Sequence, residues 1–92
     1  MADVTYDPEK RAKTLAERGL DFDDAVQVLA GPTIEVLDDR TDYGEERFQT
    51  VGLLNDRLVM IVWTPRGETR HIISMRKCNE REKEKFGRQL GP

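Results

Sequence analysis

The spacing of apolar positions changes once along the chain, and the change separates a helical first third from a β-rich remainder. Up to residue 30 the apolar residues recur three or four positions apart, which is the period of an amphipathic helix. One narrow stripe of this kind is formed by Ala12, Leu15, Ala16 and Leu20. After Gly31-Pro32 the apolar residues alternate or run together, as they do in strands.

The first third predicts a short strand and two helices. Val4–Tyr6 is the candidate strand, and Asp7-Pro8 provides a capping residue with proline at the first helical position. This helix should end at Gly19. A second helix should begin at Asp21, with acidic residues in its first turn, and end at Gly31-Pro32.

The remainder predicts four strands and one more helix. The strands are expected at 33–37, 46–54, 58–63 and 68–77, with an acidic loop over 38–44 and a tight turn at Asn55-Asp56. Six consecutive apolar residues, 58–63, indicate a central strand that is buried on both faces. Asn79 can cap a final helix over 80–86, which is almost entirely charged apart from Phe86, with Gly87 just beyond it.

This order of elements predicts an α+β fold. We expect a single domain over residues 1–92, with two N-terminal helices packed on one side of a small antiparallel sheet and a short C-terminal helix. The other face of the sheet should then be exposed, or covered by a partner or substrate.

Charge is distributed unevenly along the chain. The net charge is −3, yet residues 1–56 carry 6 Lys and Arg against 14 Asp and Glu, whereas residues 57–92 carry 9 against 4. Polyanions respond to local potential, so a basic face that binds RNA is compatible with this total. The alternative is that both halves are merely solvated and intermix in the fold.

Several classes of protein and site are excluded by composition. One cysteine and one histidine cannot form a disulfide or a structural zinc site, and the chain has no glycine-rich nucleotide fingerprint. The acidic residues of 38–46 lack the order of a calcium loop. We therefore expect no metal and no cofactor. No apolar run is long enough to cross a membrane, so we expect a cytoplasmic protein without a membrane partner.

The strongest chemical cluster lies in the last strand, from Arg70 to Lys77. Strict alternation would place Arg70, Ile72, Ser74 and Arg76 on one face and His71, Ile73, Met75 and Lys77 on the other. We expect Arg47, Arg76 and Lys77 to converge on one rim of the sheet as a phosphate clamp. Such a clamp suits metal-independent RNA cleavage, in which the 2′-hydroxyl attacks and His71 or Glu46 moves a proton. Alternatively, these cations are solvated or paired with nearby glutamates, and His71 is structural.

The sequence also resembles a known family along almost its whole length. The matching segments are Tyr6-Asp7-Pro8-Glu9-Lys10, Arg18-Gly19-Leu20-Asp21-Phe22, Tyr43-Gly44-Glu45-Glu46-Arg47, Ile72-Ile73-Ser74-Met75-Arg76-Lys77 and Glu80-Arg81-Glu82. With their order and spacing, they make the chain similar to the BrnT family, the ribonuclease toxins of BrnT/BrnA type II toxin–antitoxin modules.

The resemblance implies a RelE-like fold, metal-independent RNA cleavage that inhibits translation, and neutralisation by a BrnA-like antitoxin. It also implies a dimer of toxin–antitoxin pairs that reaches operator DNA only through the antitoxin. Among matching positions, it assigns site roles to Lys10, Glu46, Arg47, Arg76 and Lys77; His71 and Arg70 are added from the strand pattern. The chain departs from the family in having His71 where an arginine is usual, and Glu17-Arg18 where Lys-His is usual.

Two functional hypotheses follow. In the first, the protein is an endoribonuclease in which Glu46, Arg47, His71, Arg76 and Lys77 are catalytic and Lys10 and Arg70 bind substrate. In the second, the same surfaces belong to a binding module without catalysis, which docks an antitoxin-like partner or nucleic acid. An orphan structural domain is a third possibility.

Overall fold

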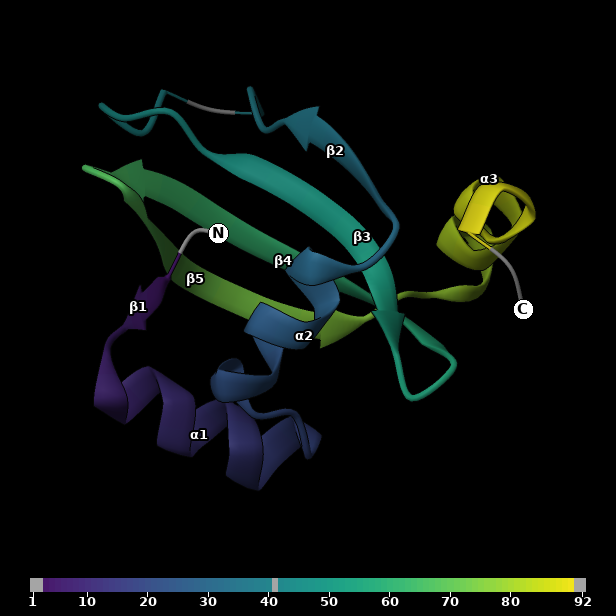
Figure 1. Cartoon of the computed structure of the whole chain (residues 1–92), viewed down its shortest axis with the longest axis horizontal. Helices are drawn as coiled ribbons and strands as arrows, with labels where there is room; N and C mark the ends of the chain where they lie inside the picture. Colours follow the sequence, from purple (N-terminus) through teal and green to yellow (C-terminus); the bar gives the residue numbers. More distant parts are fainter. Residues whose placement is uncertain (1–2, 41, 91–92) are drawn as a thin grey trace.

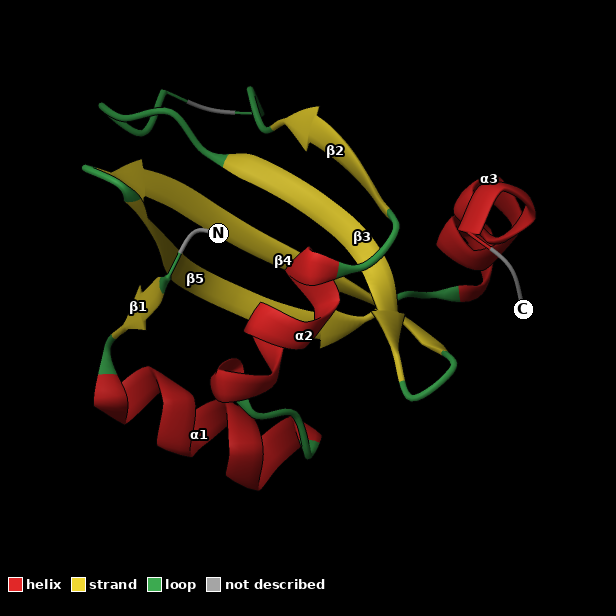
Figure 2. Cartoon of the chain, viewed as in Figure 1, coloured by secondary structure: helices red, strands yellow, loops and turns green. Residues whose placement is uncertain are grey.

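The computed structural model describes residues 3–40 and 42–90 and confirms the α+β class (Figures 1 and 2). Thr41, in the predicted acidic loop, and the two residues at each end lie outside this description. The chain forms one five-stranded sheet in the order β1-β5-β4-β3-β2. Its elements are β1 (Val4–Tyr6), α1 (Pro8–Arg18), η1 (Phe22–Asp24), α2 (Ala25–Ala30), β2 (Thr33–Leu37), β3 (Phe48–Leu54), β4 (Arg57–Arg66), β5 (Thr69–Lys77) and α3 (Glu80–Leu90).

The sheet is mixed, so the predicted purely antiparallel sheet is wrong. Strands β2 to β5 do form the expected antiparallel meander, but β1 pairs with β5 in parallel, with Thr5 opposite His71. The Arg70 N–H also donates to the Asp3 carbonyl at 2.9 Å. Short β1 could not be assigned a partner from its own residues, because its pairing joins segments more than sixty positions apart.

The N-terminal helical boundaries follow local signals closely. The Asp7 side chain accepts from the Glu9 N–H at 2.9 Å, and Gly19 closes α1 in the left-handed region at φ 69°. Asp21 likewise accepts from the Asp23 N–H, but the segment it opens begins as a 3₁₀ turn, η1, and α2 is only six residues long.

Helix α1 is not held by its apolar stripe, contrary to expectation. None of its residues is buried, Leu15 remains 43% exposed, and only Leu20, beyond the helix end, reaches the core. Polar contacts fasten the helix instead: Arg11 forms a bidentate pair with Asp21, and Arg18 Nη1 donates to the Met75 carbonyl at 2.9 Å. An arginine side chain at each end of α1 therefore ties the helix to neighbouring segments.

The main core lies between the sheet and the η1–α2 segment. As predicted, β4 is the central strand and all six residues from Leu58 to Trp63 are buried. Phe22, Ala25 and Val28 pack against one of its faces. Gly52 on β3 permits this approach, because a Cβ there would lie 2.6 Å from Val28 Cγ1.

Helix α3 packs against the opposite face of the sheet, so the expectation that this face is left exposed or covered by a partner is wrong where α3 lies on it (Figure 2). It also runs through Gly87 to Leu90 instead of ending before Gly87. Phe86 is its buried anchor, as predicted, and Leu90 packs beside it in a second cluster with Val51, Leu58, Met60 and Cys78. The final turn persists because Leu90 lies four residues after Phe86, on the same side of the helix.

Cys78 is a small buried filler in this second cluster, and burial raises the pKa of its thiol to about 11. Its basic sequence neighbours do not activate it, because the nearby Glu82 opposes them and desolvation dominates. None of the helices in the described residues is long and apolar enough to cross a membrane.

A β-bulge in β5 changes which of its side chains share a face. Ser74 pairs with Val62 and Ile72 pairs with Trp63, so Ile73 is an extra residue. Arg76, Ser74 and His71 pair with every second residue of β4, starting from Met60, which packs with α3. These three side chains therefore share the α3 side of the sheet. The strict alternation predicted for this strand is wrong beyond the bulge.

Candidate active site

His71 is held at one end of the sheet by contacts from both neighbouring strands. It lies opposite Thr64 of β4 and Thr5 of β1, and its Nδ1 is 2.9 Å from Thr5 Oγ1. The ring is half-buried. With Nδ1 engaged by the threonine hydroxyl, Nε2 is the nitrogen available to another group.

Charged groups from three separate segments act electrostatically on this histidine. Burial is the largest cause that lowers the His71 pKa below 6.5, and the positive charges of Arg66 and Lys10 lower it further, while the negative charges of Glu45 and Asp7 oppose them. Lys10 lies in the first turn of α1 and Arg66 at the end of β4. We call Thr5, Lys10, Glu45, Arg66 and His71 the His71 cluster. The lowered pKa of its histidine favours the neutral imidazole, which can accept a proton.

The loop before β3 approaches the same end of the sheet. Glu45 lies between two arginines: its carboxylate oxygens are 3.3 Å from Arg47 Nε and 4.0 Å from Arg66 Nη2. The Arg47 guanidinium also lies 3.9 Å from the centre of the Tyr43 ring. The Glu46 carbonyl accepts from Thr64 Oγ1 at 2.6 Å, so Glu46 is anchored beside the residue that pairs with His71.

Arg70 is adjacent to His71 in sequence but lies on the other face of the sheet. Its guanidinium stacks 4.7 Å from the centre of the Trp63 ring, and Phe48 stacks on Trp63. Trp63 Nε1 donates to Thr50 Oγ1, which in turn donates to Glu35. Arg70 is therefore packed onto an aromatic pair, away from the His71 cluster.

Arg76 and Lys77 lie at the opposite end of β5, so the structure does not bring them together with Arg47. Arg76 pairs with Met60 and Lys77 with Val59, near the start of β4, whereas Arg47 precedes the residue opposite Trp63. At about 3.3 Å per residue, His71 and Lys77 are separated by roughly 15–20 Å along the strand. The expected single rim of Arg47, Arg76 and Lys77 is wrong, because an antiparallel meander places the start of β3 and the end of β5 at opposite ends.

Arg76 is also already occupied by another side chain. Both of its terminal nitrogens donate to the Glu82 carboxylate at 2.7 Å, and this pair joins β5 to α3. Glu82 further accepts from the Asn79 N–H while Asn79 accepts from the Glu82 N–H, which completes a capping box. The geometry of Arg76 is that of a structural tie between strand and helix.

Arg66 and Thr5 were missed by sequence reasoning. A usable signal existed for Arg66: in a β-hairpin that turns at Gly67-Glu68, the last residues of one strand face the first residues of the next, which brings Arg66 close to His71. For Thr5 there was none, because the parallel pairing of β1 is not encoded locally.

Within the acidic loop Asp38 forms an internal contact, while the other acidic residues of 38–46 are exposed. The Asp38 side chain is fully buried, and Arg40 donates to both of its carboxylate oxygens at 2.7 and 2.8 Å. This pairing holds the Asp38 pKa below its ordinary value. Among the described residues, no three His, Cys, Asp or Glu side chains come together as metal ligands would.

Comparison with known proteins defines the class of protein. Residues 6–82 match the model of a family described as the ribonuclease toxin of type II toxin–antitoxin systems. The chain belongs to this family, BrnT, and the resemblance read from its motifs is confirmed. A search of curated proteins finds no match. Membership implies a ribonuclease toxin that has an antitoxin partner.

Proposed function

We propose that the protein is a metal-independent endoribonuclease toxin that cleaves RNA at the His71 cluster. The observation that carries this proposal is a half-buried histidine whose pKa is lowered by burial and by the charges of two cations, in a chain that belongs to a ribonuclease toxin family. A base and a positive field are what transesterification by a 2′-hydroxyl requires.

The proposed reaction uses the RNA's own 2′-oxygen as nucleophile. In this reaction His71 is the tautomer whose Nδ1–H donates to Thr5 Oγ1. Its Nε2 accepts the 2′-hydroxyl proton as the 2′-oxygen bonds to phosphorus. Lys10 and Arg66 stabilise the additional negative charge on the phosphoryl oxygens. The bond from phosphorus to the 5′-oxygen then breaks, and that oxygen takes up a proton from water. The products are a 2′,3′-cyclic phosphate and a 5′-hydroxyl.

The other residues predicted for the site take different roles in this proposal. Glu46 is the alternative proton-transfer group, since its backbone lies beside Thr64, the partner of His71. Arg47 orients Glu45, and through it Arg66. Arg70, Arg76 and Lys77 do not belong to the His71 cluster, and we assign them no part in the chemical step.

We further propose that cleavage inhibits translation in the cytoplasm and that a BrnA-like antitoxin neutralises the toxin. The two would assemble as a dimer of toxin–antitoxin pairs that contacts operator DNA only through the antitoxin. Membership of the family supports an antitoxin partner. Two N-terminal helices ahead of the antiparallel β2–β5 meander support a RelE-like layout.

His71→Gln tests the proposal directly. We expect the wild-type protein to cleave RNA in the presence of EDTA, and the variant to lose at least about 100-fold in rate, the usual contribution of a general base. Mapping of the product ends should show cyclic phosphates. Arg81→Gln, on the exposed surface of α3, is the control.

Retention of full activity by His71→Gln would overturn the assignment of the base. A wild-type protein that is inert towards RNA but still captures its antitoxin would instead favour the non-catalytic binding module.

A further inference from the structure

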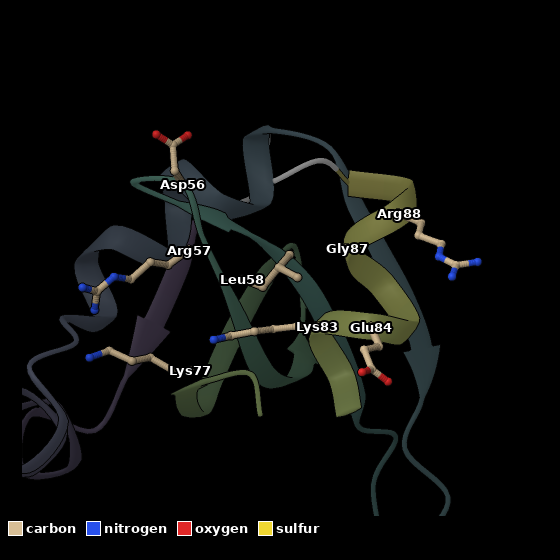
Figure 3. A pocket seen from close by; sticks show the side chains of 8 residues that line it. All are labelled: Asp56, Arg57, Leu58, Lys77, Lys83, Glu84, Gly87 and Arg88. Carbon is tan, nitrogen blue, oxygen red and sulfur yellow. The ribbon is translucent and has the colours of Figure 1, made fainter. Parts of the chain in front are cut away.

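A cleft of about 970 Å³ opens at the end of the β4–β5 pair farthest from His71 (Figure 3). We propose that this cleft is a second RNA site, which holds the sugar–phosphate backbone of a single strand whose cleavage site lies at the His71 cluster. The inference rests on the proposed ribonuclease function and extends it from the reacting phosphate to the flanking strand.

The cleft is positive although the protein is negative. Four cations line it, namely Arg57, Lys77, Lys83 and Arg88, against two carboxylates, Asp56 and Glu84. The whole chain carries a net charge of −3. A local excess of positive charge in a hollow of this size favours a polyanion over a neutral ligand.

Three of the cations point to the same side. Figure 3 shows Arg57, Lys77 and Lys83 extending together from β4, β5 and α3, whereas Asp56, Glu84 and Arg88 are directed elsewhere. The carboxylates therefore do not separate the three cationic ends from an approaching phosphate.

The charges of Arg57 and Lys77 are also uncompensated. Over residues 3–40 and 42–90, neither side chain forms an ion pair. Lys83 is held only by a 3.2 Å contact with Glu80, whose side chain is 89% exposed, and such a surface pair is weak enough for a phosphate to displace.

The lining chemistry indicates backbone contacts without base recognition. Of the described residues that line the cleft, none is aromatic, so bases have no ring on which to stack. Leu58 and Gly87 form the apolar part of the lining, where a sugar can pack. Binding here should therefore be independent of RNA sequence and strongly dependent on salt.

This site is separate from the chemistry and lies partly outside the family match. Lys77 is roughly 15–20 Å along β5 from His71, so one strand must span several nucleotides to reach both. Lys83, Glu84, Gly87 and Arg88 lie beyond residue 82, where the match to the family model ends. The cleft is thus built in part from a segment that lies outside the family match.

The test is the salt dependence of RNA binding. A fluorescent single-stranded oligoribonucleotide with 2′-O-methyl groups, which cannot be cleaved, is titrated with protein at several salt concentrations and followed by anisotropy. The variant Arg57→Gln/Lys77→Gln is compared with Lys13→Gln/Arg81→Gln, which removes the same charge from exposed helix positions. The first should bind more weakly, with the slope of log K against log salt reduced by about 1.4, because each lost single-strand contact contributes about 0.7. The control should keep the wild-type slope.

Each outcome separates the inference from the proposed function. Equal losses in both variants, or no loss in either, would overturn the cleft as an RNA site even if cleavage is intact. Weakened binding of the antitoxin with unchanged RNA binding would also overturn it and assign the cleft to a protein partner. RNA binding that depends on Arg57 and Lys77, in a protein that never cleaves RNA, would support the cleft and remove the nuclease.

Discussion

At the scale of single residues, His71 shows how the fold sets a protonation state. The ring is the only histidine in the chain, and its pKa is lowered first by burial and then by the positive charges of Arg66 and Lys10. These causes outweigh the opposing negative charges of Glu45 and Asp7, so the net shift favours the neutral imidazole. The two cations proposed to stabilise the transition state therefore also keep the base deprotonated.

Arg66→Gln should raise the His71 pKa towards 6.5, because, of the two positive charges that lower this pKa, that of Arg66 has the larger effect. Proton NMR measures this without ambiguity, since the imidazole resonances come from a single residue. The acid limb of the cleavage rate should move to higher pH by the same amount, because His71 acts in its neutral form. Lys10→Gln should shift the titration in the same direction but less. An unchanged titration in Arg66→Gln would show that this charge does not reach His71.

At the scale of elements, two glycines occupy opposite situations. Gly52 lies where α2 crosses β3, and a Cβ there would meet Val28 Cγ1 at 2.6 Å and Thr33 Cγ2 at 3.2 Å. Gly87 lies inside α3, and a Cβ there would meet only Leu58 Cδ1, at an ordinary 3.7 Å. Packing therefore requires glycine at position 52. At position 87 it does not, and glycine there makes α3 less stable than alanine would.

Gly87→Ala should stabilise the protein by about 0.5–1 kcal/mol, the difference in helix propensity between the two residues. Gly52→Ala should destabilise it by about 1–3 kcal/mol, because the added methyl overpacks the contact between α2 and the sheet. Urea denaturation of both variants measures these changes. Loss of stability in Gly87→Ala would contradict the open space described beside Leu58.

The helices, strands and turns could be predicted because their signals lie in neighbouring residues. Features that depend on pairing between distant segments could not be predicted. The capping role of Asp7, the left-handed Gly19 and the turn at Asn55-Asp56, where both residues have positive φ, each depend on a few neighbouring residues. The parallel pairing of β1 and the bulge at Ile73 depend on contacts between distant segments. The candidate site shows the same limit: the strand pattern singled out His71 as a candidate, but it grouped Arg47 with Arg76 and Lys77, which lie at the far end of the sheet.

At the scale of the whole molecule, one ion pair joins α3 to the sheet. Arg76 holds the Glu82 carboxylate through two 2.7 Å contacts, and Glu82 also accepts from the Asn79 N–H. These bonds lower the Glu82 pKa from 4.5 to about 2, with the Arg76 contact as the main cause. Only 17% of the Glu82 side chain is exposed, although 39% of the Arg76 side chain is, so solvent screens the carboxylate less than it screens the guanidinium.

Glu82→Gln should therefore change the pH dependence of unfolding. A carboxyl with a lowered pKa in the folded state stabilises the protein fully above pH 4.5, and this contribution is lost as the pH falls towards 2. At neutral pH the variant should be less stable by about 2 kcal/mol, and the difference should vanish near pH 2. Thermal unfolding across this range measures it, with the exposed Glu84→Gln as control. A constant difference at all pH values would mean that Glu82 acts through shape and not through charge.

The bulge at Ile73 also has a consequence for evolutionary comparison. Ile73 shifts the register of β5 by one position. Because of this extra residue, His71 lies on the α3 side of the sheet, and Arg70 and Ile72 lie on the α2 side. Consider a homologue whose strand lacks this extra residue. If its sequence is aligned with β5 without a gap, the residue matched to His71 lies on the α2 side of the sheet, opposite to His71 itself. Column-by-column comparison of this strand must therefore introduce a one-residue gap at Ile73, or it will equate side chains that lie on opposite sides of the sheet.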